Sequence, residues 1–345
     1  MSRDADLTIL AAKKSDFSSS ASNRTHIINA SINGKAGLIL FSFFWLLVPG
    51  KKKKYDMVIT EPSIIGVCGF WAKVVCRMKW VVDIWDIPIR CHSKSALLRI
   101  KAWLTRKIFK RLYQFADLFI VSILPDFELK EFDLPPEKML ILKNAIWLDG
   151  EKPARWTCSN QNSFNILCMR SLHTSDMGLD ILSAAFLALQ EKLQRISLTI
   201  IGIIPEDIKY QVAGLEGLKN VEFHEFVEHD RLLEMIQAAS VCVIPFKNVP
   251  DLSQTYPVKV LEYFSLGKAI IASDIAGISH MIRNGDNGLL FRAGDYQDLA
   301  EKIQQLFHNR TLMDALSKHA LESRSEFDCV TKNEVILHKL QHMLS

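Results

Sequence analysis

The stretch of sequence that decides the fold covers residues 251–298 and reads DLSQTYPVKVLEYFSLGKAIIASDIAGISHMIRNGDNGLLFRAGDYQD. Pro257 is tolerated in a first helical turn, apolar residues follow at helical spacing, and Gly267 ends that run. AIIAS (269–273) and LLF (289–291) have the character of short buried strands. The pattern predicts an αβ unit of a doubly wound sheet. The N-terminus of its helix has free N–H groups and a dipole, both of which attract phosphate.

Strands alternate with helices along the rest of the chain. The expected strands are residues 7–12, 55–60, 80–88, 116–123, 139–147, 164–169, 197–202, 220–226 (an edge strand) and 241–246. The expected helices include residues 62–77, 95–115, 178–193 and 229–239, with three more after residue 295. The polar segment 15–29 is expected to be a loop. Such alternation indicates βαβ units and parallel sheets.

A chain of 345 residues, 49% of them hydrophobic, has enough material for two cores. The segment 149–163 is polar and contains a proline, which is typical of a linker. We therefore predict one domain over residues 1–148 and a second over residues 149–325. A final helix within residues 326–345 is free to pack back on the first domain.

The cysteines and histidines predict neither disulfides nor a metal site. Seven cysteines form no CxxC pair, and their odd number suits a reducing cytoplasm. Ten histidines show no zinc spacing. The first residues, MSRDAD, do not resemble a signal peptide. The apolar run at 36–49 is too short to cross a bilayer comfortably, so it is either a buried helix or one lying on a membrane surface.

The span between Asp86 and Asp117 contains no acidic residue, whereas basic residues stand at 90, 94, 99, 101, 106, 107, 110 and 111. One face of the helix expected there carries four apolar residues, Leu97, Leu104, Ile108 and Phe115. A basic amphipathic helix predicts binding to an anionic membrane surface, and an ordinary solvated helix is the alternative. Nucleic acid is not expected as a partner, because neither a known nucleic-acid-binding motif nor an interleaving of aromatic and basic residues accompanies the charges.

Several segments resemble glycosyltransferase family 4. PVKVLEY, KAIIAS and NGDNGLLF follow one another at the spacing of that family's donor-nucleotide segment, and NVEFHEFVEHDRLLEMIQAASVCVIPF resembles the segment before it. The resemblance covers roughly residues 55–310. It implies the GT-B architecture, an α/β fold in which two tandem Rossmann-like domains face each other across a cleft. The first domain is then the acceptor side, and the second binds a nucleotide sugar.

The resemblance also implies donor-binding residues around the helix after Pro257. Glu262 matches the glutamate that accepts hydrogen bonds from both ribose hydroxyls, since a carboxylate offers two acceptors to a diol. Gln254 stands where the family usually has a second glutamate, in the same loop as Thr255 and Tyr256. Lys259 either counters the diphosphate or is a solvated lysine that points outward.

The loop after residues 164–169 departs from the family pattern. The family's lysine position is Met177 and its arginine position is Ser171, so Arg170 is the candidate substitute. In the first domain, Asp86, with Asp83 second, is the candidate group near the transferred sugar. No counterpart of the family's first strand and glycine-rich loop is recognised before residue 7. A truncated N-terminus, a misassigned start, or a protein that functions without this strand are the three interpretations.

These features predict a retaining, metal-independent hexosyltransferase at the cytoplasmic face of the inner membrane. It would move a sugar from a nucleotide diphosphate to a lipid-linked or polysaccharide acceptor, as in lipopolysaccharide synthesis, without a cofactor. The departures leave a second hypothesis, a catalytically impaired GT-B protein that binds or scaffolds a polysaccharide assembly system. A nicotinamide dehydrogenase is disfavoured because no GxGxxG follows any expected strand.

Overall fold

The computed structural model describes residues 7–11, 25–29, 55–60, 66–84, 96–122, 134–142, 144–145, 163–170, 177–249 and 256–344. The chain divides into two compact units, residues 1–142 with 338–345, and residues 143–337. The predicted boundary at 148/149 and the apolar run at 36–49 lie outside the described residues and stay predictions.

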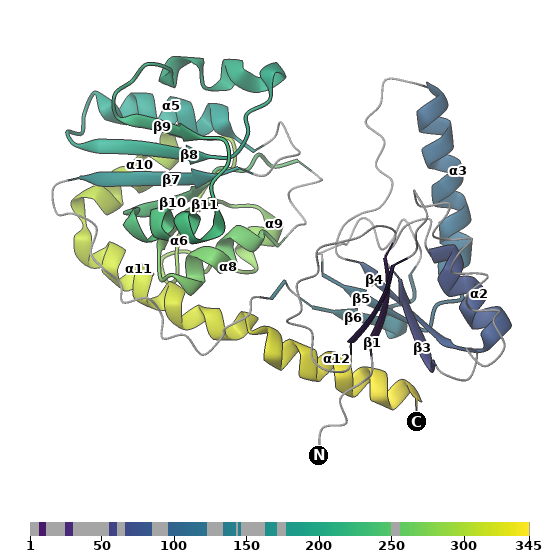
Figure 1. The fold of residues 1–345 in the computed structure, drawn as a ribbon. Coiled ribbons are helices and arrows are strands. Elements are labelled where there is room, and N and C mark those ends of the chain that lie inside the picture. Colours follow the sequence, from purple (N-terminus) through teal and green to yellow (C-terminus); the bar gives the residue numbers. More distant parts are fainter. Residues whose placement is uncertain are drawn as a thin grey trace. The chain divides into compact units, whose positions relative to one another are not determined.

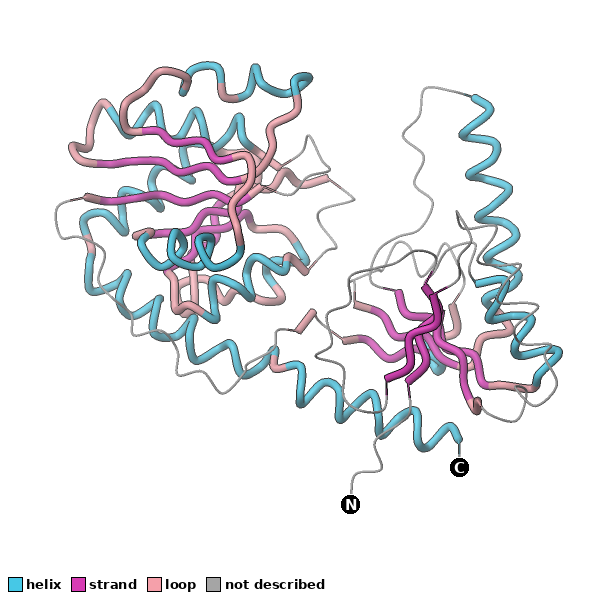
Figure 2. Tube along the Cα trace, viewed as in Figure 1, coloured by secondary structure: helices cyan, strands magenta, loops and turns pink. Residues whose placement is uncertain are grey.

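The second unit is built on a parallel six-stranded sheet (Figures 1 and 2). Its strands, in spatial order, are β12 (Leu289–Phe291), β11 (Ala269–Ser273), β10 (Val241–Ile244), β7 (Phe164–Met169), β8 (Ile196–Ile201) and β9 (Val221–His224). The edge position predicted for β9 is confirmed. The chain runs outward from β7 to β9 and then returns to the other side of β7 with β10. Ligands of open α/β sheets bind at such a reversal, beyond the carboxyl ends of the strands.

Helices cover both faces of this sheet (Figure 1). α5 (Leu179–Gln190) packs against α10 (Tyr296–His308) over a core that includes Ile166, Phe186 and Ile303. The other helices are α6 (His229–Ala238), α8 (Val258–Ser265), α9 (Ala276–Ser279) and α11 (Arg310–Ser323), with short 3-10 helices η2 (Glu206–Gln211), η3 (Ala213–Leu215) and η4 (Arg324–Phe327). The last helix, α12 (Cys329–Leu344), begins in this unit, and its residues from 338 on belong to the first unit. The 3-10 helices and α9 were not predicted, because segments of three to six residues are too short to show periodicity.

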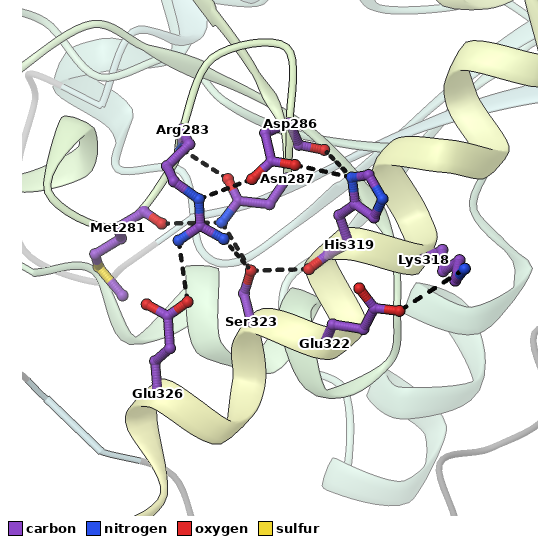
Figure 3. A network of polar contacts seen from close by, with 9 residues as sticks. All are labelled: Met281, Arg283, Asp286, Asn287, Lys318, His319, Glu322, Ser323 and Glu326. Atoms are coloured by element: carbon purple, nitrogen blue, oxygen red, sulfur yellow. Dashed lines mark hydrogen bonds and ion pairs between the residues drawn. The ribbon is translucent and has the colours of Figure 1, made fainter.

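A polar network fixes the turn between β11 and β12 (Figure 3). Asn287 is fully buried; its Oδ1 accepts a hydrogen bond from the backbone N of Arg283 at 2.7 Å, and its Nδ2 donates to Ser323 Oγ at 2.9 Å. The Arg283 guanidinium pairs with Asp286 at 2.8 Å and with Glu326 at 3.0 Å. These contacts tie the turn to α11 and η4. The NGDNG segment is therefore a structural joint of the second unit.

The first unit contains a parallel four-stranded sheet in the order β3 (Met57–Thr60), β4 (Lys79–Ile84), β5 (Leu118–Val121) and β6 (Met139–Ile141). The 3-10 helix η1 (Pro136–Lys138) leads into β6. Among the residues of this unit that the structure describes, α2 (Gly66–Cys76) and α3 (Ala96–Tyr113) are α-helices. Trp80 is fully buried in β4, and its Nε1 donates to Thr60 Oγ1 at 3.0 Å. α2 lies directly on this indole, since a Cβ at Gly69 would stand 2.0 Å from Nε1.

The loop predicted at residues 15–29 is wrong in part. Residues Thr25–Asn29 form β2, which pairs in parallel with β1 (Leu7–Ala11) over five residues. Polar neighbours hide this short strand in the sequence, although its centre is the β-branched pair Ile27 and Ile28. Within the described ranges, no helix is both long and apolar enough to cross a bilayer.

Candidate functional site

The carboxyl ends of β7 and β10 are held close to the start of α5. Gly178, the N-cap of α5, has φ +72°, and a Cβ there would stand 1.7 Å from the carbonyl oxygen of Pro245, just after β10. Only glycine fits both the backbone conformation and the contact. The local chain thus brings a helix N-terminus to the reversal point of the sheet.

Lys259 lies in the first turn of α8 and is buried, with 9% of its surface exposed. Its Nζ donates to the carbonyl oxygen of Met169, the last residue of β7, at 2.7 Å and lies 5.6 Å from the centre of the Phe246 ring. Burial lowers the pKa of this amine to about 8. The alternative of a solvated lysine that points outward is therefore wrong.

Glu262 lies one turn after Lys259 on α8 and is half-buried. Burial raises the pKa of its carboxyl above the usual value, while Lys259 and His229 act in the opposite direction. His229 begins α6, so the N-terminal end of that helix is electrostatically coupled to Glu262. The sequence reasoning missed His229; its signal was its place at the start of the predicted helix 229–239, three residues after the predicted edge strand.

Arg170 continues β7 and is also buried, with 8% of its surface exposed. Its guanidinium donates to the carbonyl oxygen of Ile203. Burial lowers its pKa, and the negative charge of Asp207 opposes that shift. Met177 is buried and apolar, so it supplies no charge at the family's lysine position, and Ser171 lies outside the described residues.

Lys247 is a further cation at this edge of the sheet that the sequence reasoning missed. It follows β10 by three residues and forms an ion pair of 2.7 Å with Asp180, in the first turn of α5. Its position directly after a buried strand was the available signal. The pair links the two segments that flank the reversal point.

Tyr256 lies just before α8 and is buried, with 4% of its surface exposed. Its carbonyl oxygen accepts a hydrogen bond from Asn144 Nδ2 at 2.7 Å, and its ring meets the His280 ring edge-on at 6.4 Å between centres. Burial raises the pKa of its hydroxyl. Gln254 and Thr255, the other residues of the predicted donor loop, lie outside the described residues.

The aspartates predicted near the transferred sugar belong to the first unit. Asp83 lies in β4 and is half-buried, and burial raises the pKa of its carboxyl. Asp86 lies outside the described residues. Their roles stay predictions.

Two cations and one carboxylate thus gather at the carboxyl end of β7. Lys259 and Arg170 are close enough that each affects the same buried thiol, Cys168, and the charge of Arg170 lowers the pKa of Lys259. An anion bound between them relieves this repulsion, because an opposite charge favours the protonated form of both groups. Glu262 adds an acceptor for hydroxyl groups nearby. A ligand with a phosphate group and a diol matches this set of groups.

Residues 163–309 match the family model described as "Glycosyl transferases group 1". The matched segment contains all of the second unit's strands and the candidate donor-binding residues from Arg170 to Glu262. The resemblance predicted from the sequence motifs is confirmed for this segment, which makes up less than half of the chain.

Two curated relatives match most of the chain. One is the N,N'-diacetylbacillosaminyl-diphospho-undecaprenol alpha-1,3-N-acetylgalactosaminyltransferase of Campylobacter jejuni, 24% identical over 84% of this chain and 78% of that protein. The other is the UDP-Gal:alpha-D-GlcNAc-diphosphoundecaprenol alpha-1,3-galactosyltransferase of Escherichia coli, 23% identical over 79% of this chain and 71% of that protein.

Among solved structures, Anabaena HepE in complex with UDP-glucose is similar, with a TM-score of 0.67 and 17% identity over 92% of this chain and 86% of that chain. At this identity the likeness concerns the fold. The prediction of an α/β fold of the GT-B type, built from two Rossmann-like domains, is confirmed.

Proposed function

We propose that this chain transfers a sugar from a nucleotide-diphosphate sugar to a lipid-linked saccharide, because residues 163–309 match the model of the group 1 glycosyltransferases. The names of the two curated relatives support this acceptor class, since both act on saccharides linked to undecaprenol diphosphate. The complex of Anabaena HepE with UDP-glucose supports a UDP-sugar as the donor. A polysaccharide is the other acceptor that we expect.

The observation that carries the proposal is the grouping of Lys259, Arg170 and Glu262 at the carboxyl end of β7. In this proposal, Glu262 accepts hydrogen bonds from the two ribose hydroxyls, and the two cations face the diphosphate. The cations matter most as the glycosidic bond breaks, because the leaving diphosphate then gains negative charge. Side chains that supply positive charge support transfer without a metal cofactor.

The proposal extends to the residues near the sugar, the stereochemistry of transfer and the location of the protein. In this proposal Gln254, Thr255 and Tyr256 contact the sugar of the donor, and Asp86, or else Asp83, is the candidate group that acts near the transferred sugar. We propose retention of the anomeric configuration and a location at the cytoplasmic face of the inner membrane. Proton NMR of the product formed by the purified protein in EDTA tests retention and metal independence together. An inverted product, or transfer that stops in EDTA and returns with a divalent cation, contradicts these assignments.

Calorimetric titration with UDP and with uridine tests the donor site. Glu262→Ala leaves two hydroxyls without their acceptor, at about 1–3 kcal/mol each, so affinity for both ligands falls by one to several orders of magnitude. Glu322→Ala, at an exposed carboxylate of α11, serves as the control and leaves both affinities unchanged. Unchanged UDP binding by the Glu262 variant places the nucleotide elsewhere.

The second candidate is a GT-B protein that binds a nucleotide sugar but transfers no sugar. Buried, apolar Met177 favours it, because this position normally supplies a cation to the diphosphate. A transfer and donor-hydrolysis assay separates the two candidates. UDP release with a lipid-linked acceptor supports the enzyme, whereas tight UDP binding without turnover supports the binding protein.

A further inference from the structure

α3 has apolar side chains on two opposite faces. Phe109 and Tyr113 point into the first unit and are 2% and 1% exposed. On the opposite face, Leu97, Leu104 and Ile108 are 76%, 48% and 56% exposed. The outward face of an ordinary surface helix is polar, because water solvates it. The outward face of α3 therefore differs from that of an ordinary water-facing helix and suits an apolar partner.

The exposed apolar surface continues from α3 onto α2, which packs beside it (Figure 1). The Phe70 ring on α2 meets the ring of Phe115, just after α3, at 5.2 Å between centres and that of Trp71 at 6.1 Å. Phe115 and Trp71 are themselves 51% and 41% exposed. We call this surface the α2–α3 face; its exposed apolar members are Trp71, Val74, Leu97, Ile100, Trp103, Leu104, Ile108 and Phe115.

Basic side chains accompany this face. Lys107 is exposed, and its Nζ lies 5.0 Å from the centre of the Trp103 ring. Arg111, one turn further along α3, is exposed as well, and Lys110 is half-buried. The sequence contains no acidic residue from 87 to 116. The face thus combines an apolar strip, two tryptophans and net positive charge.

These properties discriminate between a second copy of the chain and a lipid surface. In a symmetric dimer the same patch meets itself, so the basic residues would face one another across the contact. A bilayer with anionic lipids matches both parts of the face: acyl chains accept the apolar strip, and headgroups neutralise the lysines and arginines. Tryptophan is favoured at the boundary between headgroups and hydrocarbon.

We propose that the α2–α3 face docks on the surface of a bilayer that contains anionic lipids, with α3 lying in the interface. The proposal deepens the proposed function, because a lipid-linked acceptor lies in such a membrane, but the physical argument for docking does not depend on catalysis. Both attractions are needed, since a single weak anchor gives only marginal membrane binding.

Flotation of the full chain with vesicles tests the proposal. We expect binding to phosphatidylcholine vesicles that contain 30% phosphatidylglycerol, and much weaker binding to phosphatidylcholine alone. Removing one basic residue near an anionic surface weakens binding about fivefold, so Lys107→Gln with Arg111→Gln should weaken it by roughly 25-fold. Binding should also decline as salt rises, because screening acts over about 10 Å at 0.1 M.

The apolar contribution is tested by Leu104→Glu with Ile108→Glu, which should abolish flotation. Tyr210→Glu is the matched control, because Tyr210 is 73% exposed but lies in the second unit, and it should float like the parent protein. Lipids with a spin label near the headgroup should quench less tryptophan fluorescence in Trp103→Phe than in the parent. Far-UV circular dichroism and UDP titration show whether each variant is folded.

Three results overturn the proposal: no flotation of the parent, full flotation of the double glutamate variant, or equal loss with Tyr210→Glu. Dimerisation that the double glutamate variant loses, without vesicle binding by the parent, would make the face a contact between copies. Glu262→Ala should lose UDP binding and still float like the parent protein. A failure of the proposed donor site can therefore be distinguished from a failure of the membrane face.

Discussion

The lowered pKa of Lys259 makes a quantitative prediction about proton uptake on nucleotide binding. Burial moves the pKa of the amine from 10.5 to about 8, so about half of the molecules carry a neutral lysine at pH 8. A diphosphate placed against Nζ favours the charged form and returns the pKa toward its ordinary value. Binding of UDP at pH 8 should therefore take up about half a proton, against about a tenth at pH 7.

The same shift links stability to pH, with a sign that can be checked separately. The unfolded chain binds this proton more tightly than the folded chain between pH 8 and 10.5, so this lysine makes stability rise with pH across that window. A pKa shift of this size changes the free energy of unfolding by on the order of 3 kcal/mol across that window. Lys259→Met removes this pH dependence. Urea denaturation of the parent and the variant at pH 7 and pH 10 measures the free energies of unfolding that show it.

Calorimetry in buffers of different ionisation enthalpy measures the proton uptake directly. A terminal phosphate has a second pKa near 6, so UDP itself exchanges few protons at pH 8. Lys268→Met is the matched control, because Lys268 is also buried and donates to a backbone oxygen, that of Gln237 at 3.0 Å. It precedes β11, so it lies at the amino end of the strands, away from the candidate site.

We expect the uptake to disappear in Lys259→Met and to persist in Lys268→Met. An unchanged uptake in the Lys259 variant, or a parent that binds UDP without taking up protons at pH 8, would refute the placement of this amine against the diphosphate. In that case Lys259 only secures α8 to the end of β7.

Two further predictions concern the frame around the site, and urea denaturation measures both. Gly178→Ala should destabilise the protein by several kcal/mol, because the added Cβ would stand 1.7 Å from the carbonyl oxygen of Pro245. Gly217→Ala is the control: this residue has φ +79° and nothing lies within 4 Å of the added Cβ, so the substitution should cost only about 1–2 kcal/mol. Asn287→Ala should cost about 2–4 kcal/mol, because the backbone N of Arg283 loses its acceptor and the Ser323 hydroxyl loses one of its two donors. Equal stability of the parent and this variant would show that the network is dispensable.

The sequence by itself determined the class of fold. Strands and helices of the second unit follow from apolar runs, Gly267 and the turn at Gly285, because hydrophobic period and backbone freedom are local properties. The motif PVKVLEY likewise singled out Lys259 and Glu262 as partners on one helix. Local signals failed for β2, where two isoleucines stand among polar residues.

Only the tertiary structure decided what surrounds these side chains. It brought Lys259 on α8 within 2.7 Å of the carbonyl of Met169, 90 residues earlier, and burial there is what lowers the pKa of the amine. It also decided which face of α3 packs inward: periodicity identifies apolar stripes, but with stripes on two sides it does not say which one is covered. Burial and charge environment depend on residues far apart in the chain, which a local sequence pattern does not contain.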